Sequence, residues 1–194
     1  NNSHAVMTGR TMDWPESTRP ILTVLPRGMN RDGGMAGTQT VMAENPARWT
    51  SKYGSLVTTT YGIGTADGLN EKGLGIHMLF LNATDFGTRD TDLPGLQAGL
   101  WGQYLLDNAA TVDEALKLLA NIQVVMVKAG GHDANLHLAV EDASGDSAIV
   151  EYIAGEPVVH HGRDFVIMTN DPAYDAQLEI LKTQDFSHPA SDMP

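Results

Sequence analysis

Residues 137–153 read HLAVEDASGDSAIVEYI, and this stretch decides the fold class. Two runs rich in apolar and β-branched residues, 137–140 and 147–153, flank the polar, glycine-containing segment 141–146. Two strand-like runs joined by such a connection predict a β-hairpin of two antiparallel strands.

Similar short runs lie on both sides of this hairpin. They are rich in β-branched or aromatic residues, and glycine, proline or asparagine bounds them, so we interpret them as further strands. Upstream they cover residues 6–8, 21–25, 38–42, 57–61 and 73–81, the last entered through a turn-like stretch at 67–70; downstream they cover 157–160 and 165–169.

The middle of the chain changes to a helical period. Apolar residues at 96, 100, 104 and 105 fit one helix face, and Thr111 to Glu114 form a capping box in front of a second apolar stripe. Pro172 predicts the start of a third helix. Because the order is strands, two helices, strands, helix, we expect an α+β fold in which helices pack on an antiparallel sheet. No repeat or linker divides the chain, which predicts one domain over residues 1–194.

The composition excludes several classes of function. The chain has 194 residues, and 12 Lys+Arg against 24 Asp+Glu give a net charge of -12. This charge argues against binding to nucleic acid and to anionic membranes. No apolar run approaches the roughly 18 residues of a membrane span. The chain has no cysteine, so it offers no disulfide and no thiol of its own.

The seven histidines do not predict a metal site. His160 and His161 are neighbours, which would point to opposite faces of a strand, and His132 and His137 lack the spacing of a zinc motif. We expect structural or surface histidines, no metal and no cofactor.

Two polar segments are candidates for a functional site. Arg10 and Asp13 do not follow strand alternation. Either they mark the end of a strand, with Arg10 in a salt bridge and Asp13 in a turn, or they are held at the end of a sheet to position a reacting amide. Asn170 follows a predicted strand and precedes Pro172, so it either directs its carboxamide at an oxyanion or caps the next helix.

Four segments together resemble the choloylglycine hydrolase family. This family contains bile salt hydrolases and penicillin V acylases and belongs to the N-terminal nucleophile (Ntn) hydrolases. The matching segments are TGRTMDW at 8–14, DGLNEKGL at 67–74, EDASGD at 141–146 and TNDP at 169–172. The resemblance implies an αββα sandwich, with two antiparallel sheets between helix layers, of which this chain would form a part.

The resemblance also implies a mechanism and catalytic residues. In the family, the thiolate of an N-terminal cysteine attacks a linear amide, and its own α-amino group transfers the proton. Arg10 resembles the arginine beside the thiol, Asp13 the aspartate that holds the α-amino group, and Asn170 the asparagine near the scissile carbonyl. A cation favours a thiolate and a carboxylate orients an amine, so these roles fit the chemistry.

The chain departs from the family pattern at three points. The cysteine is absent and by family spacing would lie several residues before Asn1. The second oxyanion position falls at Phe80, which has no side-chain donor, although Asn82 is expected two residues further on the same strand face. A downstream family arginine has no counterpart. We therefore expect an internal portion of a longer enzyme, truncated at both ends.

Finer features suggest one branch of the family. The aromatic residue Phe80 resembles the aromatic residue that acylases have at this position. The sequences DWPE at 13–16 and NLHL at 135–138 are similar to those of Gram-negative members of the family. Those are often exported to the periplasm and cleave penicillin V or long-chain acyl-homoserine lactones. Trp14, Phe80 and Phe86 either line an apolar acyl pocket or belong to the core.

The sequence therefore predicts an amidase that acts on linear acyl amides. The resemblance implies a small-molecule acyl amide as substrate, a homo-oligomer, commonly a homotetramer, and a periplasmic or secreted location, with the cytoplasm as the alternative. The rival functions are an inactive family member and a ligand-binding protein without turnover.

Overall fold

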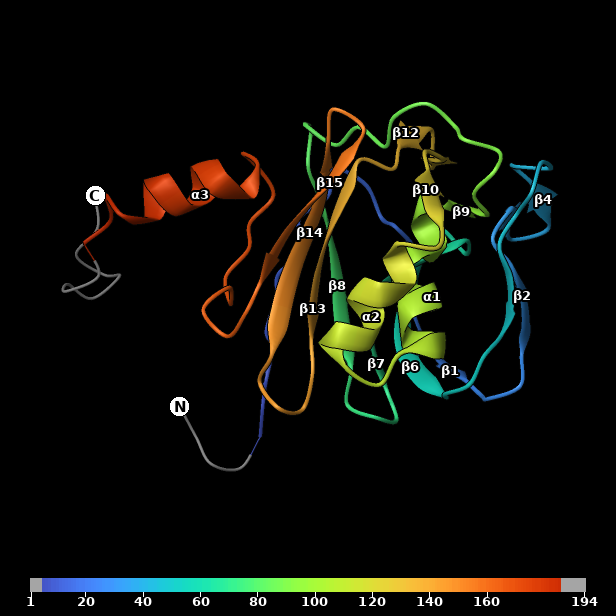
Figure 1. Cartoon of the computed structure of the whole chain (residues 1–194), viewed down its shortest axis with the longest axis horizontal. Coiled ribbons are helices and arrows are strands. Elements are labelled where there is room, and N and C mark those ends of the chain that lie inside the picture. Colours follow the sequence, from blue (N-terminus) through green and yellow to red (C-terminus); the bar gives the residue numbers. More distant parts are fainter. Residues whose placement is uncertain (1–4, 186–194) are drawn as a thin grey trace.

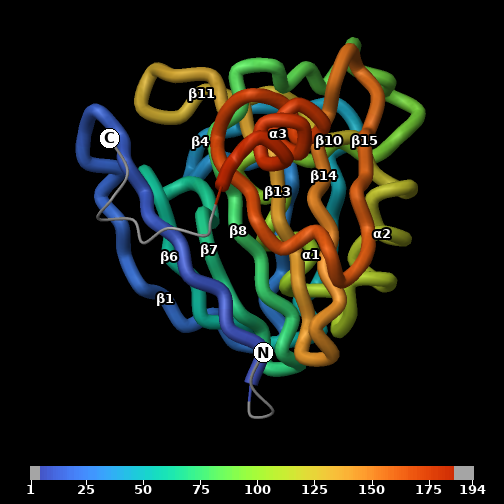
Figure 2. Tube along the Cα trace, turned by 90° about the vertical axis from the view of Figure 1, so that its left-hand side faces the viewer, coloured from blue at the N-terminus to red at the C-terminus, as the bar shows by residue number. Residues whose placement is uncertain are grey.

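The computed structural model describes residues 5–185, and a seven-stranded antiparallel sheet dominates it. The spatial order of the strands is β1-β6-β7-β8-β13-β14-β15, and Figure 2 shows them side by side in that order. Their bounds are Ile21–Leu25 (β1), Ser55–Thr60 (β6), Gly64–Asn70 (β7), Gly75–Phe80 (β8), Leu136–Glu141 (β13), Ser147–Ile153 (β14) and Glu156–His161 (β15).

Two helices cover one face of this sheet, and Figure 1 shows them on the same side of β7, β8 and β13. They are α1 (Trp101–Asn108), preceded by a 3-10 turn at Ala98–Leu100, and α2 (Val112–Leu119). The predicted capping box opens α2: Glu114 N donates to Thr111 Oγ1 at 3.2 Å, and Ala110 N donates to Glu114 Oε2 at 2.8 Å. The side chain of Thr111 therefore satisfies one of the unpaired backbone donors at the start of this helix.

A glycine in the sheet lets α1 approach closely. A Cβ on Gly68 of β7 would lie 2.6 Å from Leu106 Cδ1 and 2.7 Å from Val57 Cγ1. The buried side chain of Asn70, at the end of β7, donates to the carbonyls of Leu106 (2.9 Å) and Ala109 (2.7 Å) at the end of the helix. Residues 67–70 therefore join the sheet to α1.

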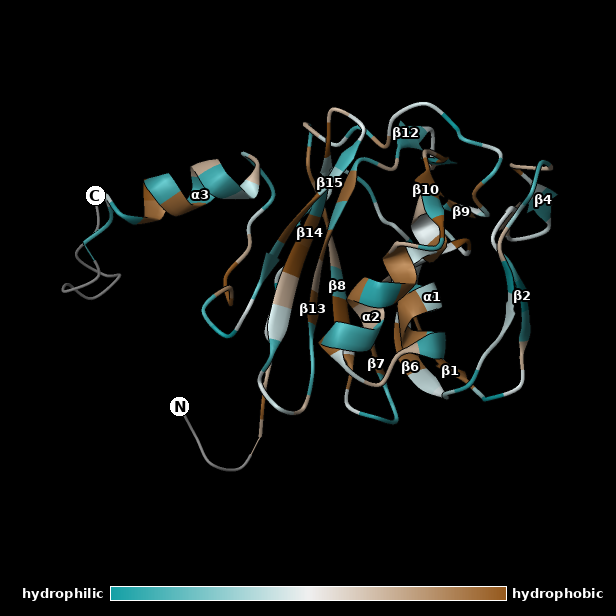
Figure 3. Ribbon diagram, viewed as in Figure 1, coloured by the Kyte–Doolittle hydropathy of each residue, from teal (hydrophilic) through white to brown (hydrophobic). Residues whose placement is uncertain are grey.

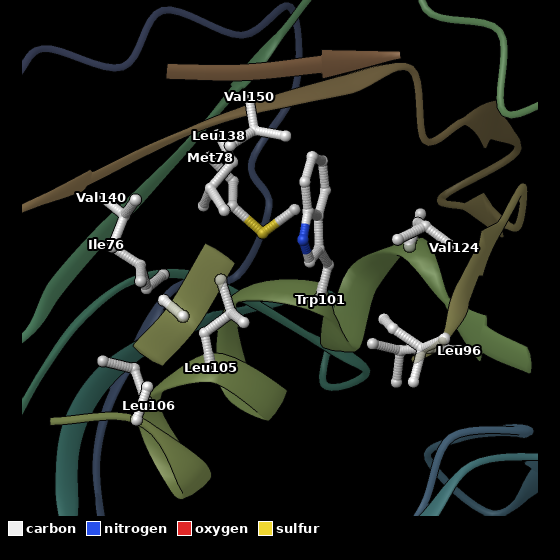
Figure 4. Packing of buried hydrophobic residues seen from close by; sticks show 14 of the residues in the cluster. Ile76, Met78, Leu96, Trp101, Leu105, Leu106, Val124, Leu138, Val140 and Val150 are labelled. Atoms are coloured by element: carbon white, nitrogen blue, oxygen red, sulfur yellow. The ribbon is translucent and has the colours of Figure 1, made fainter. Parts of the chain in front are cut away.

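The hydrophobic core fills the space between these helices and the sheet. Trp101 is fully buried and lies beside Met78 in Figure 4, with side chains of α1, β8, β13 and β14 around it. Figure 3 shows the matching pattern, since β13, β14 and the sheet-facing sides of the two helices are largely hydrophobic. Burial of this apolar surface stabilises the layer arrangement.

The other face of the sheet carries the N-terminal segment and the third helix. In Figure 2 the N-terminal segment, in blue, crosses the front of the sheet toward β1, and α3 (Tyr174–Leu181) lies on the same side. The backbone N–H of Tyr174 donates to both carboxylate oxygens of Glu151 on β14, at 3.1 and 3.0 Å. This carboxylate fixes the start of α3.

The remaining strands form four short pairs outside the large sheet. The antiparallel pairs are β2 (Asn30–Asp32) with β5 (Arg48–Thr50), β3 (Met35–Ala36) with β4 (Gln39–Thr40), and β11 (Lys128–Ala129) with β12 (His132–Asp133); β9 (Gly95–Gln97) and β10 (Gln123–Val125) are parallel.

The α+β class is confirmed, and so is the hairpin of β13 and β14. Residues 5–185 contain one large sheet with its helix layer, which is one half of the expected four-layer sandwich. Several local predictions were wrong: residues 6–8 and 165–169 are not strands, residues 67–70 belong to β7 rather than a turn, and residues 95–97 form a strand before α1. Residues 67–70 were misjudged because their Asp-Gly pair is typical of turns.

Candidate functional site

Arg10, in the N-terminal segment that crosses the sheet, is held by two strands of that sheet. Its Nη1 donates to both carboxylate oxygens of Asp67 on β7, at 3.1 and 3.2 Å, and to the carbonyl of Met78 on β8 at 2.9 Å. The side chain is only 18% exposed. The predicted salt bridge of Arg10 is confirmed, with Asp67 as its partner, but residues 10–13 form neither a strand end nor a turn.

A histidine extends this ion pair across the sheet. His77 Nδ1 lies 2.8 Å from Asp67 Oδ1, and His77 Nε2 lies 2.9 Å from Glu141 Oε1 on β13. Burial by itself would lower the pKa of His77, but the hydrogen bonds to the two carboxylates outweigh burial and raise this pKa to about 9. Thr8 Oγ1 donates to Glu141 Oε1 at 3.0 Å, so the chain of contacts returns to the N-terminal segment.

A cavity of about 280 Å³ lies beside Arg10, between the N-terminal segment and the ends of several strands. Five of the predicted site residues line it: Arg10, Asp13, Trp14, Phe80 and Asn170. Asp13 and Asn170 are exposed, and the helix that follows Asn170 is capped at Ala173, so the helix-cap interpretation of Asn170 is wrong. The structure thus brings the three predicted catalytic residues to one cavity.

Aromatic side chains form one wall of this cavity. The Trp14 ring lies 5.4 Å from that of Phe80 and 5.6 Å from that of His132, between ring centroids. Trp14 Nε1 donates to the hydroxyl of Tyr61 at 2.8 Å, and that hydroxyl donates to Glu16 Oε1 at 3.0 Å. Such a wall provides an apolar surface for an acyl group next to polar groups that fix orientation.

Asn82 does not take the predicted position beside Phe80. Strand β8 ends at Phe80, so the alternation of side chains stops there. Asn82 instead faces Asp171: its backbone N and its Nδ2 donate to the two carboxylate oxygens at 3.0 and 2.8 Å. Among the described residues, Asn82 is not part of the cavity lining. The contact of Asn82 with Asp171 fixes the segment that follows Asn170.

Phe86 also lies elsewhere, so its assignment to an acyl pocket was wrong. It is 4% exposed and belongs to the core on the helix side of the sheet. Its ring centroid lies 5.2 Å from that of Tyr152 and 6.2 Å from that of Trp101. Of the two interpretations of the aromatic residues, the core interpretation holds for Phe86, whereas Trp14 and Phe80 line the cavity.

Sequence reasoning missed four residues of this region: Tyr61, Asp67, His77 and His132. Asp67 and His77 are directly opposite each other in the register of β7 and β8. If residues 67–70 had been interpreted as a strand, the pairing of an acid with a histidine would have indicated both. Tyr61 lies in a turn and His132 in the two-residue strand β12, so alternation gives no signal at either position.

Within residues 5–185, no three histidine or acidic side chains are arranged so that they could hold a metal ion. Over the same residues, no helix is long and apolar enough to cross a membrane. The cavity lining combines a cation, a carboxylate and a carboxamide, on Arg10, Asp13 and Asn170, with apolar side chains. Such groups can stabilise an anion, orient an amine and donate to an oxyanion.

Comparison with known proteins identifies a family. The model of the linear amide C–N hydrolases of the choloylglycine hydrolase family matches residues 1–191. A penicillin V acylase of Pectobacterium atrosepticum is 40% identical over 93% of this chain and 49% of its own length. A bile salt hydrolase/transferase of Clostridium perfringens is 29% identical over 86% of this chain and 50% of its own length. The chain thus spans about half the length of these curated relatives.

Solved structures show the same relationship. A penicillin V acylase from Agrobacterium tumefaciens superposes with a TM-score of 0.77 and 45% identity, over 88% of this chain and 50% of the other. A mutant of the conjugated bile acid hydrolase from Clostridium perfringens has a TM-score of 0.73 at 24% identity, over 88% and 51% of the two chains. At that identity the second likeness concerns the fold alone.

Proposed function

The chain belongs to the choloylglycine hydrolase family of linear amide C–N hydrolases, and we propose that the complete protein hydrolyses a linear amide with an apolar acyl group. One observation carries the proposal: Arg10, Asp13 and Asn170 line the same cavity as Trp14 and Phe80. The polar groups suit the amide, and the aromatic wall suits the acyl chain.

The proposed nucleophile is the thiolate of an N-terminal cysteine, which lies outside these 194 residues. It attacks the amide carbonyl carbon, the α-ammonium group protonates the leaving amine, and water then hydrolyses the thioester. Arg10 stabilises the thiolate, Asp13 orients the α-amino group, and Asn170 donates a hydrogen bond to the oxyanion. In this scheme Phe80 contributes apolar contact rather than a donor.

Within the family we propose an activity of the penicillin V acylase type. The acylases resemble this chain more closely, at 40% and 45% identity, than the bile salt enzymes do, at 29% and 24%. The contact of Trp14 with Phe80 supports the same choice, because the two tilted rings offer an apolar surface to an aromatic or straight-chain acyl group.

The remaining expectations rest on the family resemblance alone. We propose a periplasmic or secreted location and a homo-oligomer, commonly a tetramer. Cell fractionation and light scattering of the complete protein test them. Recovery in the cytoplasm, or a monomer at working concentration, would contradict the respective expectation.

The test uses the complete protein and a panel of penicillin V, glycine-conjugated bile salts and acyl-homoserine lactones. We expect turnover of penicillin V and iodoacetamide labelling of an N-terminal cysteine. Hydrolysis of bile salts alone would refute the acylase preference. Ligand binding without turnover and without a labelled cysteine would favour the ligand-binding alternative.

Asp13→Asn provides a sharper test, with Asp113→Asn as the matched control outside the cavity. Asp113 is exposed in the first turn of α2. We expect Asp13→Asn to lower kcat by about two orders of magnitude, because the amine loses its charged partner, and Asp113→Asn to leave kcat unchanged. Equal kcat values for the two variants would remove Asp13 from the mechanism.

A further inference from the structure

His77 lies at the centre of a chain of charged side chains to which the proposed reaction assigns no role. Building on the proposed function, we propose that His77 is a positioning residue: as an imidazolium between Asp67 and Glu141, it fixes the carboxylate that holds Arg10 at the cavity. His77 does not line the cavity that contains Arg10, Asp13 and Asn170; it lines an adjoining cavity, to which Arg10 and Asn170 also belong.

The contacts of the ring define its charge. Both ring nitrogens face carboxylate oxygens, at 2.8 Å on Asp67 and 2.9 Å on Glu141. A carboxylate oxygen only accepts, so each nitrogen must carry a hydrogen, and an imidazole with two N–H groups is a cation. The ring is 15% exposed, which shields these bonds from water. The raised pKa of His77, about 9, agrees with this geometry.

The register of the sheet places the three groups together. Asp67 on β7 is directly opposite His77 on β8, and Glu141 on β13 lies diagonally from His77, whose direct partner is Ala139. Directly opposed and diagonal side chains on one face of a sheet are within reach of each other. The arrangement therefore depends on regular strands rather than on loops.

The imidazolium connects to the cavity through Asp67. Asp67 Oδ1 accepts from both His77 Nδ1 and Arg10 Nη1, so the same oxygen serves both cations. The charged groups that face His77 are Asp67 and Glu141, and Arg10 lies on the other side of Asp67. When His77 and these three side chains are all ionised, their charges sum to zero. If His77 loses one proton, a lone pair on one ring nitrogen faces a carboxylate oxygen, and the net charge of the four side chains becomes -1.

The same histidine also fixes the path of the N-terminal segment. Glu141 accepts from Thr8, and Asp67 accepts from Arg10, so two positions of this segment are attached to the two carboxylates that His77 joins. Displacement of either carboxylate would therefore move Arg10. An arginine that leaves the cavity can no longer favour a thiolate there.

The first test is independent of catalysis and uses NMR of the complete protein with 15N-labelled histidine. We expect the His77 ring to remain doubly protonated at pH 7.5, and its midpoint to fall by about one unit in Asp67→Asn and in Glu141→Gln, because each removes one carboxylate. In a second sample with 15N-labelled arginine, the Nη1–H of Arg10, assigned with Arg10→Lys, should exchange several-fold faster in His77→Gln, because Nη1 donates to Asp67. A neutral His77 ring at pH 7.5, or an unchanged Arg10 signal, would overturn the proposal.

The second test measures the reaction as a function of pH. In His77→Gln, the acidic limb of the pH profile of kcat/KM should move to higher pH, with little change in KM. The acidic limb of the pH profile of the iodoacetamide labelling rate should move in the same direction. His77→Lys, which keeps a cation, should restore part of the shift. The control is His161→Gln, an exposed histidine paired with Asp146 at 2.9 Å. If His77→Gln keeps the wild-type profile, His77 has no positioning role. If the wild type does not turn over, the proposed function fails, and the NMR test still decides the role of His77.

Discussion

Two phenylalanines six residues apart are expected to respond to truncation in opposite ways. Phe86 is 4% exposed among Trp101 and Tyr152, with centroids 6.2 and 5.2 Å away. Truncation of a buried phenylalanine typically costs about 3–5 kcal/mol, and aromatic pairs add to this. We therefore expect Phe86→Ala to lower the free energy of unfolding by about 4 kcal/mol.

Phe80 is only partly buried and lines the cavity beside Trp14. Phe80→Ala enlarges a space that solvent already reaches, so no closed void forms. We expect a loss of about 1 kcal/mol, from the apolar contact with Trp14. The substrate should respond instead, with KM for an amide with an aromatic acyl group rising about tenfold, which corresponds to about 1.4 kcal/mol of lost contact.

Urea unfolding of both variants at about 25 °C, followed by tryptophan fluorescence, measures the two stability changes. The midpoint should fall much further for Phe86→Ala than for Phe80→Ala, with the slope of the transition unchanged. A loss below about 1 kcal/mol for Phe86→Ala, together with a larger effect on KM than that of Phe80→Ala, would refute the reasoning. It would return Phe86 to the acyl pocket.

Three further changes test other parts of the fold. Thr111→Ala removes the cap of α2 and should cost about 1 kcal/mol in urea unfolding, whereas Thr111→Ser should cost almost nothing. Gly68→Ala would place a Cβ 2.6 Å from Leu106 and should cost about 2 kcal/mol, whereas Gly9→Ala, with nothing within 4 Å, should be neutral in the same assay. The pKa of His77 is about 9 in the folded protein, against 6.5 for an ordinary histidine. This difference contributes about 3 kcal/mol to the free energy of unfolding. The contribution is fully present below pH 6.5 and is lost as the pH rises through 9. Urea midpoints between about pH 6 and 10 should therefore fall in the wild type and stay level in His77→Gln; parallel curves would contradict the ion network.

Local patterns predicted the elements whose signals are local. The capping box at Thr111 needs only four residues, and the hairpin of β13 and β14 needs only its turn and two alternating runs. Residues 6–8 have strand-like composition but cross the face of the sheet, and Thr8 reaches Glu141 with its side chain. Composition does not indicate whether a neighbouring strand is available, and without one such a segment cannot form a ladder.

The error at Asn82 has a physical origin, which is the point where strand alternation stops. Asn82 was assigned to the cavity by continuing the alternation from Phe80, yet β8 ends at Phe80. After that point Leu81 N bonds to the carbonyl of Asn135, and the chain turns toward Asp171 and the core. A period of two holds only while the strand is paired.

The converse error concealed the ion network. Residues 67–70 contain Asp-Gly and Asn, so they resemble a turn, but in the structure each of these three has a use in β7: Asp67 holds Arg10, Gly68 admits α1, and Asn70 completes the end of α1. Whether Asp67 meets His77 depends on the register of β7 against β8, which no single segment encodes. Arg10, Asp13 and Trp14 could be found because they are neighbours in sequence. The groups that hold Arg10 in place could not, because two strands and a register bring them together.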